Sequence, residues 1–324
     1  MNYKLLGKTG LHVSPLCLGT MTFGAEADAS ESGRLYATAR DSGINIFDCA
    51  NVYAEGESER ILGKLVEAHR SEVILATKAY FPTGEGINDR GGSRFHLTKA
   101  LDASLKRLGT DYVDIYYLHN FDRATALDES LSTLNDFVRN GKVLYIGLSN
   151  FAAWQVMKAI AITEQKNYAP ITCLQPMYNL LKRQCEIEIL PMANDQQLGI
   201  FSYGPLAGGL LTGKYLSRNS QEPARLDTSE MYQKRYEDEQ NAVSVKAFVD
   251  FAQQNNYEAI SLAVAWAGSH PSITAPIIGA RNAGQLKPVL ESMNIQITAE
   301  LRDTIAGFSQ APAPANDRSE ENQR

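Results

Sequence analysis

The chain has 324 residues, 44% of them hydrophobic, and a formal net charge of −6 at pH 7. Its basic residues are scattered, so nucleic acid is not expected as a partner, and no run of about 18 or more apolar residues predicts a membrane span. The N-terminus lacks the apolar stretch of a signal peptide. The four cysteines form no C-x-x-C pair, which predicts free thiols in a cytoplasmic protein and no metal site.

A short hairpin is predicted at the start of the chain. Residues 3–6 and 11–14 are strand-like and flank the turn sequence GKTG at residues 7–10. This hairpin precedes the first strand of the main sheet, and we expect it to close the bottom of a barrel.

Beyond the hairpin, short runs rich in β-branched residues alternate with longer amphipathic stretches. The predicted strands are residues 15–21, 44–50, 73–79, 113–119, 143–150, 171–178, 199–203 and 274–279. The clearest predicted helices are residues 97–108, 127–139, 154–164 and 259–268. Several of the amphipathic stretches end in glycine, which is typical of a helix C-terminus.

This alternation predicts a parallel sheet covered by helices. Eight units in a row favour a closed (β/α)8 TIM barrel over an open doubly wound sheet. We expect one domain over residues 1–310, with a long polar insert at residues 217–239 after the seventh strand and a helix-like stretch up to Asn255. The tail, residues 311–324, is rich in polar residues, proline and alanine and is predicted to be disordered.

Three predicted strands end in a polar side chain. Asp48 follows the apolar run of the second strand, Lys78 ends the third, and His119 ends the fourth. Tyr53 follows in the loop after Asp48. Each of these residues alone has an ordinary structural interpretation, such as a helix cap, a surface charge or a packing residue. The carboxyl ends of the strands form the active-site face of a (β/α)8 barrel, so the four residues are expected to meet there.

Together these four side chains predict a proton donor for carbonyl reduction. Hydride transfer to a carbonyl carbon leaves negative charge on the oxygen, which must receive a proton. A free tyrosine has a pKa of ~10, and a nearby ammonium group lowers it. We expect Lys78 to lower the pKa of Tyr53 by ~2–3, which requires roughly 3–4 kcal/mol of differential stabilisation. Asp48 would hold Lys78 in place, and His119 would orient the carbonyl oxygen.

Ordered motifs at several independent positions carry a family resemblance. They are residues 7–14 (GKTGLHVS), 18–24 (LGTMTFG), 47–53 (FDCANVY), 94–114, 147–151 (GLSNF), 175–179 (QPMYN) and 204–215 (GPLAGGLLTGKY). With these motifs the chain resembles the aldo-keto reductase family over residues 4–308. The resemblance implies NADPH-dependent reduction of aldehydes or ketones to alcohols. It also implies that Tyr53 is the general acid, assisted by Lys78, Asp48 and His119.

The glycine-rich run after the seventh predicted strand is the main candidate for cofactor binding. No G-x-G-x-x-G follows a predicted strand, so the fingerprint of a Rossmann fold is missing. Residues 208–214 fit G-x-x-x-x-G-K, but Tyr215 stands where a P-loop has Ser or Thr, which argues against a nucleotide hydrolase. As a dinucleotide clamp, the glycines would let the backbone approach a pyrophosphate, and Lys214 would add a cation.

The resemblance also implies the residues that would hold NADP(H). The nicotinamide would stack on Tyr203, and Arg281 would grip the 2′-phosphate because a guanidinium can bind it through two bonds. Arg225 would either fold over the cofactor or remain a surface charge. The full set is Gly19, Thr20, Met21, Ser149, Asn150, Gln175, Tyr203, Gly204, Pro205, Leu206, Gly208, Lys214, Arg225, Gly279, Arg281 and Gln285.

Some positions depart from the family pattern. Gly204 replaces a common serine, and Pro288 and Val289 stand where an acidic residue and asparagine often follow, so the adenine contacts and the preference for NADP over NAD stay open. Two alternatives remain: an NADP(H)-binding regulatory subunit with little turnover, and an NAD-preferring sugar or polyol dehydrogenase. The loop at residues 80–95 has four glycines, which suggests a mobile loop on the substrate side. The sequence gives neither the physiological substrate nor the oligomeric state.

Overall fold

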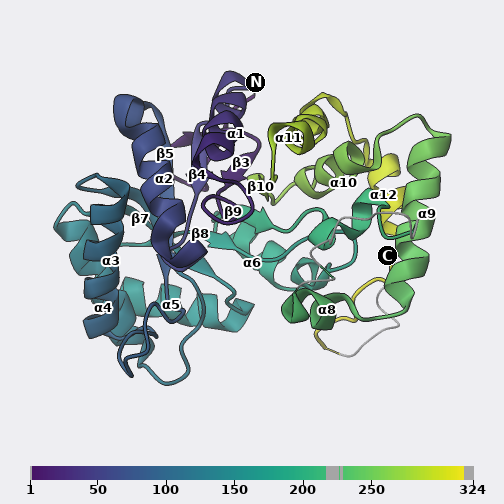
Figure 1. Cartoon of the computed structure of the whole chain (residues 1–324). Coiled ribbons are helices and arrows are strands. Elements are labelled where there is room, and N and C mark those ends of the chain that lie inside the picture. Colours follow the sequence, from purple (N-terminus) through teal and green to yellow (C-terminus); the bar gives the residue numbers. More distant parts are fainter. Residues whose placement is uncertain (1, 217–225, 227–228, 317–324) are drawn as a thin grey trace.

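A closed parallel β-barrel forms the centre of the protein, which the computed structural model describes over residues 2–216, 226 and 229–316 (Figure 1). Neighbouring strands follow the order β10-β3-β4-β5-β6-β7-β8-β9, so the ring keeps the chain order and closes between β10 and β3. The strands are β3 (Cys17–Gly19), β4 (Ile46–Asp48), β5 (Ile74–Ala79), β6 (Val113–Leu118), β7 (Val143–Ser149), β8 (Ile171–Gln175), β9 (Gly199–Tyr203) and β10 (Ala275–Ile278). The predicted (β/α)8 barrel is therefore confirmed.

Helices surround the barrel (Figure 1). Those of the described residues are α1 (Ala29–Asp41), α2 (Glu57–Val66), α3 (Arg94–Leu108), α4 (Leu127–Arg139), α5 (Ala153–Lys166), α6 (Ile189–Asp195), α8 (Glu230–Tyr236), α9 (Gln240–Gln254), α10 (Ala259–Gly268), α11 (Ala283–Leu290) and α12 (Ala299–Ala306). None of them combines the length and the apolar character needed to cross a lipid bilayer. Helix α3 shows the local signals: the Ser93 side chain caps its first turn, and Gly109 ends it in the left-handed region with φ 66°.

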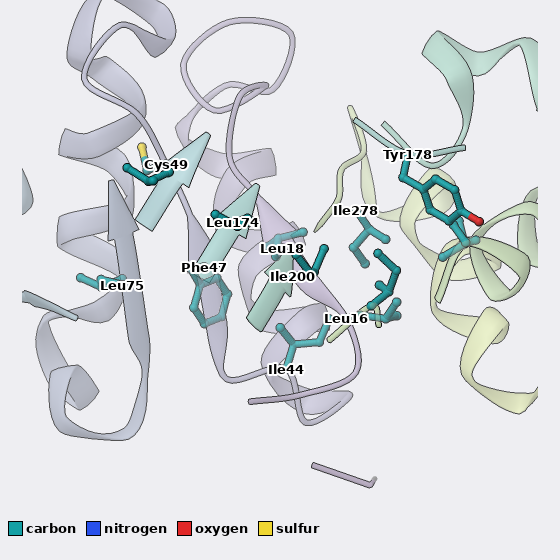
Figure 2. Packing of buried hydrophobic residues seen from close by; sticks show 14 of the residues in the cluster. Leu16, Leu18, Ile44, Phe47, Cys49, Leu75, Leu174, Tyr178, Ile200 and Ile278 are labelled. Atoms are coloured by element: carbon teal, nitrogen blue, oxygen red, sulfur yellow. The ribbon is translucent and has the colours of Figure 1, made fainter. Parts of the chain in front are cut away.

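Side chains of the strands alternate between the inside of the barrel and the helical layer. On β5, for example, Ile74 and Ala76 belong to the cluster inside the barrel, and Leu75 packs outward. Figure 2 shows part of the outward layer, where Leu18, Phe47 and other labelled side chains lie between strands and helices. Both faces of the sheet are therefore buried, in agreement with the nearly continuous apolar runs of the strands.

The N-terminal hairpin closes one end of the barrel, as predicted. It pairs β1 (Lys4–Leu5) with β2 (His12–Val13) in antiparallel register. Leu6 and Val13 are fully buried and belong to the same cluster as the inward side chains of the strands. We call this hairpin with Leu6 the plug of the barrel. Gly199 leaves room for it, because a Cβ at that position would lie 2.2 Å from Leu6 Cδ1.

Several predicted boundaries are wrong. The strand predicted at residues 171–178 ends at Gln175, because the next residue is Pro176, which has no N–H to donate to a sheet. The polar insert at residues 217–239 contains helix α8, and its residues 217–225 and 227–228 lie outside the described residues, as does most of the predicted disordered tail. The extent of the single domain stays a prediction.

The loop at residues 80–95 is tied down by carboxylates. Asp89 accepts a hydrogen bond from the backbone of Gly86 and pairs with Lys99 at 2.9 Å, and Asp122 accepts one from Gly92 at 2.7 Å. These contacts oppose the mobility suggested by the glycines.

A buried ion pair supports the segment that carries the predicted general acid. The Glu59 side chain on α2 is fully buried and bonds Arg107 Nε at 2.7 Å and Thr77 Oγ1 at 2.6 Å. Gly56, at the start of α2, packs against the same arginine, since a Cβ there would lie 2.7 Å from Arg107 Cδ. This pair therefore links the turn after Tyr53 to β5 and α3.

Replacement of Arg107 by leucine is expected to lower the free energy of unfolding by about 3–5 kcal/mol, because it leaves the Glu59 carboxylate buried without its counterion. Urea denaturation would measure the change. The control is Arg60→Leu, which breaks an exposed pair with Glu57 and is expected to cost at most about 1 kcal/mol. Equal effects of the two variants would contradict a structural role of the buried pair.

Candidate active site

A cavity of about 910 Å³ lies where the strands end. Its volume falls at the upper end of the range of roughly 300–1,000 Å³ that is usual for small-molecule sites. The predicted residues that line it are Gly19, Met21, Asp48, Tyr53, His119, Ser149, Asn150, Gln175, Tyr203, Gly204, Pro205, Leu206, Gly208, Lys214, Gly279, Arg281 and Gln285. The sequence therefore located most of the wall of this cavity.

Three of the four predicted catalytic residues form one hydrogen-bonded group. Lys78 is fully buried behind the cavity wall, and its Nζ lies 2.6 Å from Asp48 Oδ2 and 2.7 Å from the carbonyl oxygen of Cys49. The same Nζ lies 3.4 Å from Tyr53 Oη. The lysine thus reaches the tyrosine hydroxyl from inside the barrel, while the tyrosine faces the cavity.

The backbone after Tyr53 is strained. Ala54 and Glu55 adopt left-handed conformations with φ 45° and 54°, which residues with a Cβ rarely adopt. Such strain persists where the surrounding structure fixes it, and it is concentrated at functional sites. Here the strained residues lie in the short segment that joins Tyr53 to α2.

Burial controls the acidity of Tyr53. It raises the pKa of Tyr53 to about 12, although the nearby Lys78 ammonium acts in the opposite direction. The expectation that Lys78 lowers this pKa below ~10 is therefore wrong for the site as it stands, because loss of hydration outweighs the attraction of the ammonium. Burial by itself would lower the pKa of Lys78, but Asp48 and Tyr53 together raise it. The group is thus a protonated tyrosine next to a charged lysine.

His119 faces the tyrosine across the cavity. Its ring lies edge-on to Tyr53, with centroids 6.1 Å apart, and it packs against Phe81 at 4.8 Å. Burial, with a smaller effect from Lys78, holds the pKa of His119 well below its usual range. Its Nδ1 is buried without a hydrogen-bond partner among the described residues. A neutral imidazole in this position can donate a hydrogen bond to a carbonyl oxygen.

Residues of the predicted cofactor-binding set form a second network beside this group. Gln175 Nε2 donates to Asp48 Oδ1 at 2.8 Å. Asn150 donates to the carbonyl oxygen of His119 at 2.9 Å and accepts from Tyr203 Oη at 2.8 Å. The network fixes the Tyr203 ring at the cavity wall. The two networks meet at Asp48, and the second also holds the backbone of His119, so their geometries are coupled.

Among the described residues of the predicted cofactor set, Thr20 does not line the cavity. Thr20 is fully buried, and its hydroxyl donates to the carbonyl oxygen of Asp48 at 3.1 Å. It supports the strand ends from behind. Arg225 lies outside the described residues.

The glycine-rich run after β9 curls into a cradle. Gly204, Gly208 and Gly209 all have positive φ, between 69° and 95°. A Cβ at Gly208 would lie 2.8 Å from the ring of Tyr232, and one at Gly209 would lie 2.9 Å from Lys214 Cε. At Gly208 and Gly209, a residue with a Cβ would therefore fit only if these neighbouring side chains moved.

Helix α8 supplies cavity residues that sequence reasoning missed. Met231, Tyr232 and Arg235 line the cavity, and Tyr236 is buried with its hydroxyl against Asn179 at 3.0 Å. The spacing of the two tyrosines, four residues apart, is helical and was the available signal. It was obscured by the polar residues around it.

Comparison with known proteins decides the family. A sequence model described as "Aldo/keto reductase family" matches residues 15–309. The chain belongs to the aldo/keto reductase family. The resemblance found in residues 4–308 is therefore confirmed.

Similarity to individual relatives spans nearly the full chain. The protein is 40% identical over 314 residues to the uncharacterized oxidoreductase YrpG of Bacillus subtilis (strain 168), covering 93% of this chain and 94% of the relative. It is 34% identical over 311 residues to L-glyceraldehyde 3-phosphate reductase of Escherichia coli (strain K12), covering 91% and 88%. It is also 34% identical over 320 residues to a probable voltage-gated potassium channel subunit beta of Oryza sativa subsp. japonica, covering 96% and 97%. The oxidoreductases among these relatives support the conclusion that this protein is an oxidoreductase.

Aldo/keto reductases generally use nicotinamide cofactors, and the residues of this cavity fit one. The glycine cradle has the backbone freedom to approach a pyrophosphate. Lys214 beside the cradle and Arg281 beyond β10 are cations on the same wall. Tyr203 offers an aromatic face within the network of Asn150.

Proposed function

We propose that this aldo/keto reductase catalyses the NADPH-dependent reduction of small aldehydes or ketones to alcohols. The observation that carries the proposal is the contact of Tyr53 Oη with the buried Lys78, which is itself held by Asp48. This arrangement sets a protonated hydroxyl in the wall of a cavity of cofactor size, with a charged ammonium buried directly behind it.

The residues divide the chemistry between them. A bound reduced nicotinamide supplies the hydride. Tyr53 gives its hydroxyl proton to the carbonyl oxygen, and Lys78 stabilises the phenolate that remains. Neutral His119 donates a hydrogen bond to the same oxygen and fixes its position.

Cofactor binding is assigned to three parts of the wall. Ser149, Asn150 and Gln175 are proposed to hold the carboxamide next to Tyr203. The cradle with Lys214 is proposed to hold the pyrophosphate. Arg281 is proposed to bind the 2′-phosphate.

Four buried, unpaired cysteines suit the reducing cytoplasm, which we propose as the location of the protein.

The first test is the consumption of NADPH, with NADH in parallel, against a panel of aldehydes, ketones and aldoses. Turnover of ~1 s⁻¹ or more would support the reductase. Tight NADPH binding with negligible turnover across the panel would refute it.

Replacement of Arg281 by alanine is expected to raise KM for NADPH by about 10-fold or more and to change KM for NADH far less, because only NADPH carries the 2′-phosphate. Steady-state kinetics with both cofactors measures the difference. Lys287→Ala, on the following helix and outside the cavity lining, is the control. Equal effects on the two cofactors would remove Arg281 from the phosphate site.

A regulatory subunit is the second candidate. The similarity to the Oryza sativa potassium channel subunit beta, which covers 96% of this chain, favours it. Such a protein would bind the same cofactor but turn over little, so the substrate panel separates the two functions.

A further inference from the structure

One cation of the cavity has no role in the proposed function. Arg235 on α8 is half-buried, lines the cavity, and lies with its guanidinium carbon 5.1 Å from the centre of the Tyr232 ring. Within the described parts of the chain it makes neither a hydrogen bond nor an ion pair. The adjacent Lys234, by contrast, pairs with Glu230 at 2.7 Å and stays exposed.

The charges on the cavity wall are unbalanced. Among the described lining residues Asp48 is the one carboxylate, and its two oxygens are already bonded to Lys78 and Gln175. Lys214 and Arg281 have phosphate groups of the cofactor as proposed partners. Among the residues that the structure describes, the guanidinium of Arg235 therefore has no counterion, and such a group binds carboxylate or phosphate through two bonds.

Arg235 lines the same cavity as Tyr203, the predicted stacking partner of the nicotinamide. It acts on Tyr203 and Tyr236, where it lowers the pKa of each hydroxyl against a larger rise caused by burial. The Tyr203 hydroxyl donates to Asn150, whose amide donates in turn to the backbone of His119. Tyr203, on which Arg235 acts through its charge, is therefore two hydrogen bonds away from the backbone of the histidine that faces Tyr53.

We propose that Arg235 binds an anionic group, a carboxylate or a phosphate, on the carbonyl substrate. The preferred substrates of the enzyme would then be anionic aldehydes or ketones. This inference rests on the proposed reductase function, and it adds the substrate class. The competing source of the anion is the pyrophosphate of the cofactor itself, because Tyr232 links α8 to Gly208 of the cradle.

The test compares 4-formylbenzoate with its neutral methyl ester in the wild type, in Arg235→Gln and in Lys234→Gln. The ratio of kcat/KM for the acid to kcat/KM for the ester is expected to fall about 10- to 100-fold in Arg235→Gln, the usual effect of losing a charged hydrogen bond. Lys234→Gln removes the same charge from the same helix outside the cavity, and its ratio is expected to stay unchanged. Arg235→Lys keeps the charge but lacks the forked donors of the guanidinium. Its ratio is expected to lie between those of the wild type and of Arg235→Gln.

The other outcomes each identify a different error. An unchanged ratio together with a raised dissociation constant for NADPH, measured by nucleotide fluorescence, would assign Arg235 to the cofactor and overturn the proposal. An unchanged ratio with unchanged NADPH binding would also overturn it. A wild type that reduces neither these two aldehydes nor any member of the substrate panel would refute the reductase function. The binding of 4-formylbenzoate to the NADP⁺ complex, measured by calorimetry in wild type and Arg235→Gln, would still decide the role of Arg235.

Discussion

Replacement of Tyr53 by phenylalanine is expected to lower kcat for aldehyde reduction by roughly 10²- to 10⁴-fold, the usual contribution of a general acid. The variant keeps the ring and loses only the hydroxyl that Lys78 contacts at 3.4 Å. Affinity for NADPH is expected to change by less than about twofold, since no cofactor contact is assigned to this hydroxyl. Single-turnover kinetics and nucleotide fluorescence measure the two quantities.

The matched control for this variant is Tyr116→Phe. Tyr116 lies on β6, three residues before His119, and its hydroxyl is buried without a partner among the described residues. Its loss is expected to leave turnover and stability unchanged or slightly improved. If Tyr53→Phe lost NADPH binding together with turnover, the tyrosine would be structural and the proposed acid would be another group.

Replacement of Lys78 by methionine is expected to lower kcat by about 10²- to 10³-fold in both directions. The ammonium lowers the pKa of Tyr53 whereas Asp48 raises it, so the variant raises this pKa above its value of about 12. At every pH below that value the variant has less phenolate than the wild type. Alcohol oxidation, which needs phenolate as the base, should therefore be slower in the variant and should reach its plateau at a higher pH.

A double variant separates catalysis from folding at this position. Lys78→Met alone leaves the Asp48 carboxylate buried without its counterion, which destabilises the barrel. Asp48→Asn/Lys78→Met removes that charge as well, and circular dichroism reports whether the fold is recovered. A pH profile of alcohol oxidation that stays unchanged in a folded Lys78→Met variant would rule out the proposed effect on the tyrosine.

The order of the strands in the barrel could be predicted because a local sequence pattern marks each strand. Each strand is a short apolar run, and Asp48, Lys78 and His119 stand at positions where such runs end, so the topology brings them to one face without further information. Helix α8 was not predictable in this way. It has seven residues, and Tyr232 and Tyr236 hold it in place through contacts with Gly208 and Asn179, which lie elsewhere in the chain.

The acidity of Tyr53 shows a different limit of sequence reasoning. The residues that act on it were identified correctly, but the direction of the net effect depends on how much water reaches the hydroxyl. Tyr53 lines the cavity directly in front of the fully buried Lys78, and this position follows from the packing of the whole barrel. A list of neighbouring charges contains no such information.

The plug of the barrel imposes an order of events on a newly made chain. Leu6 and Val13 leave the ribosome before any strand of the barrel, yet the seat of Leu6 is at Gly199 on β9, near the end of the ring. Almost the entire barrel must therefore be synthesised before Leu6 can reach this seat. Because contacts between distant parts of a chain form slowly, the hairpin is made first and docks among the last, and closure of the barrel is an event that follows synthesis of the C-terminal half.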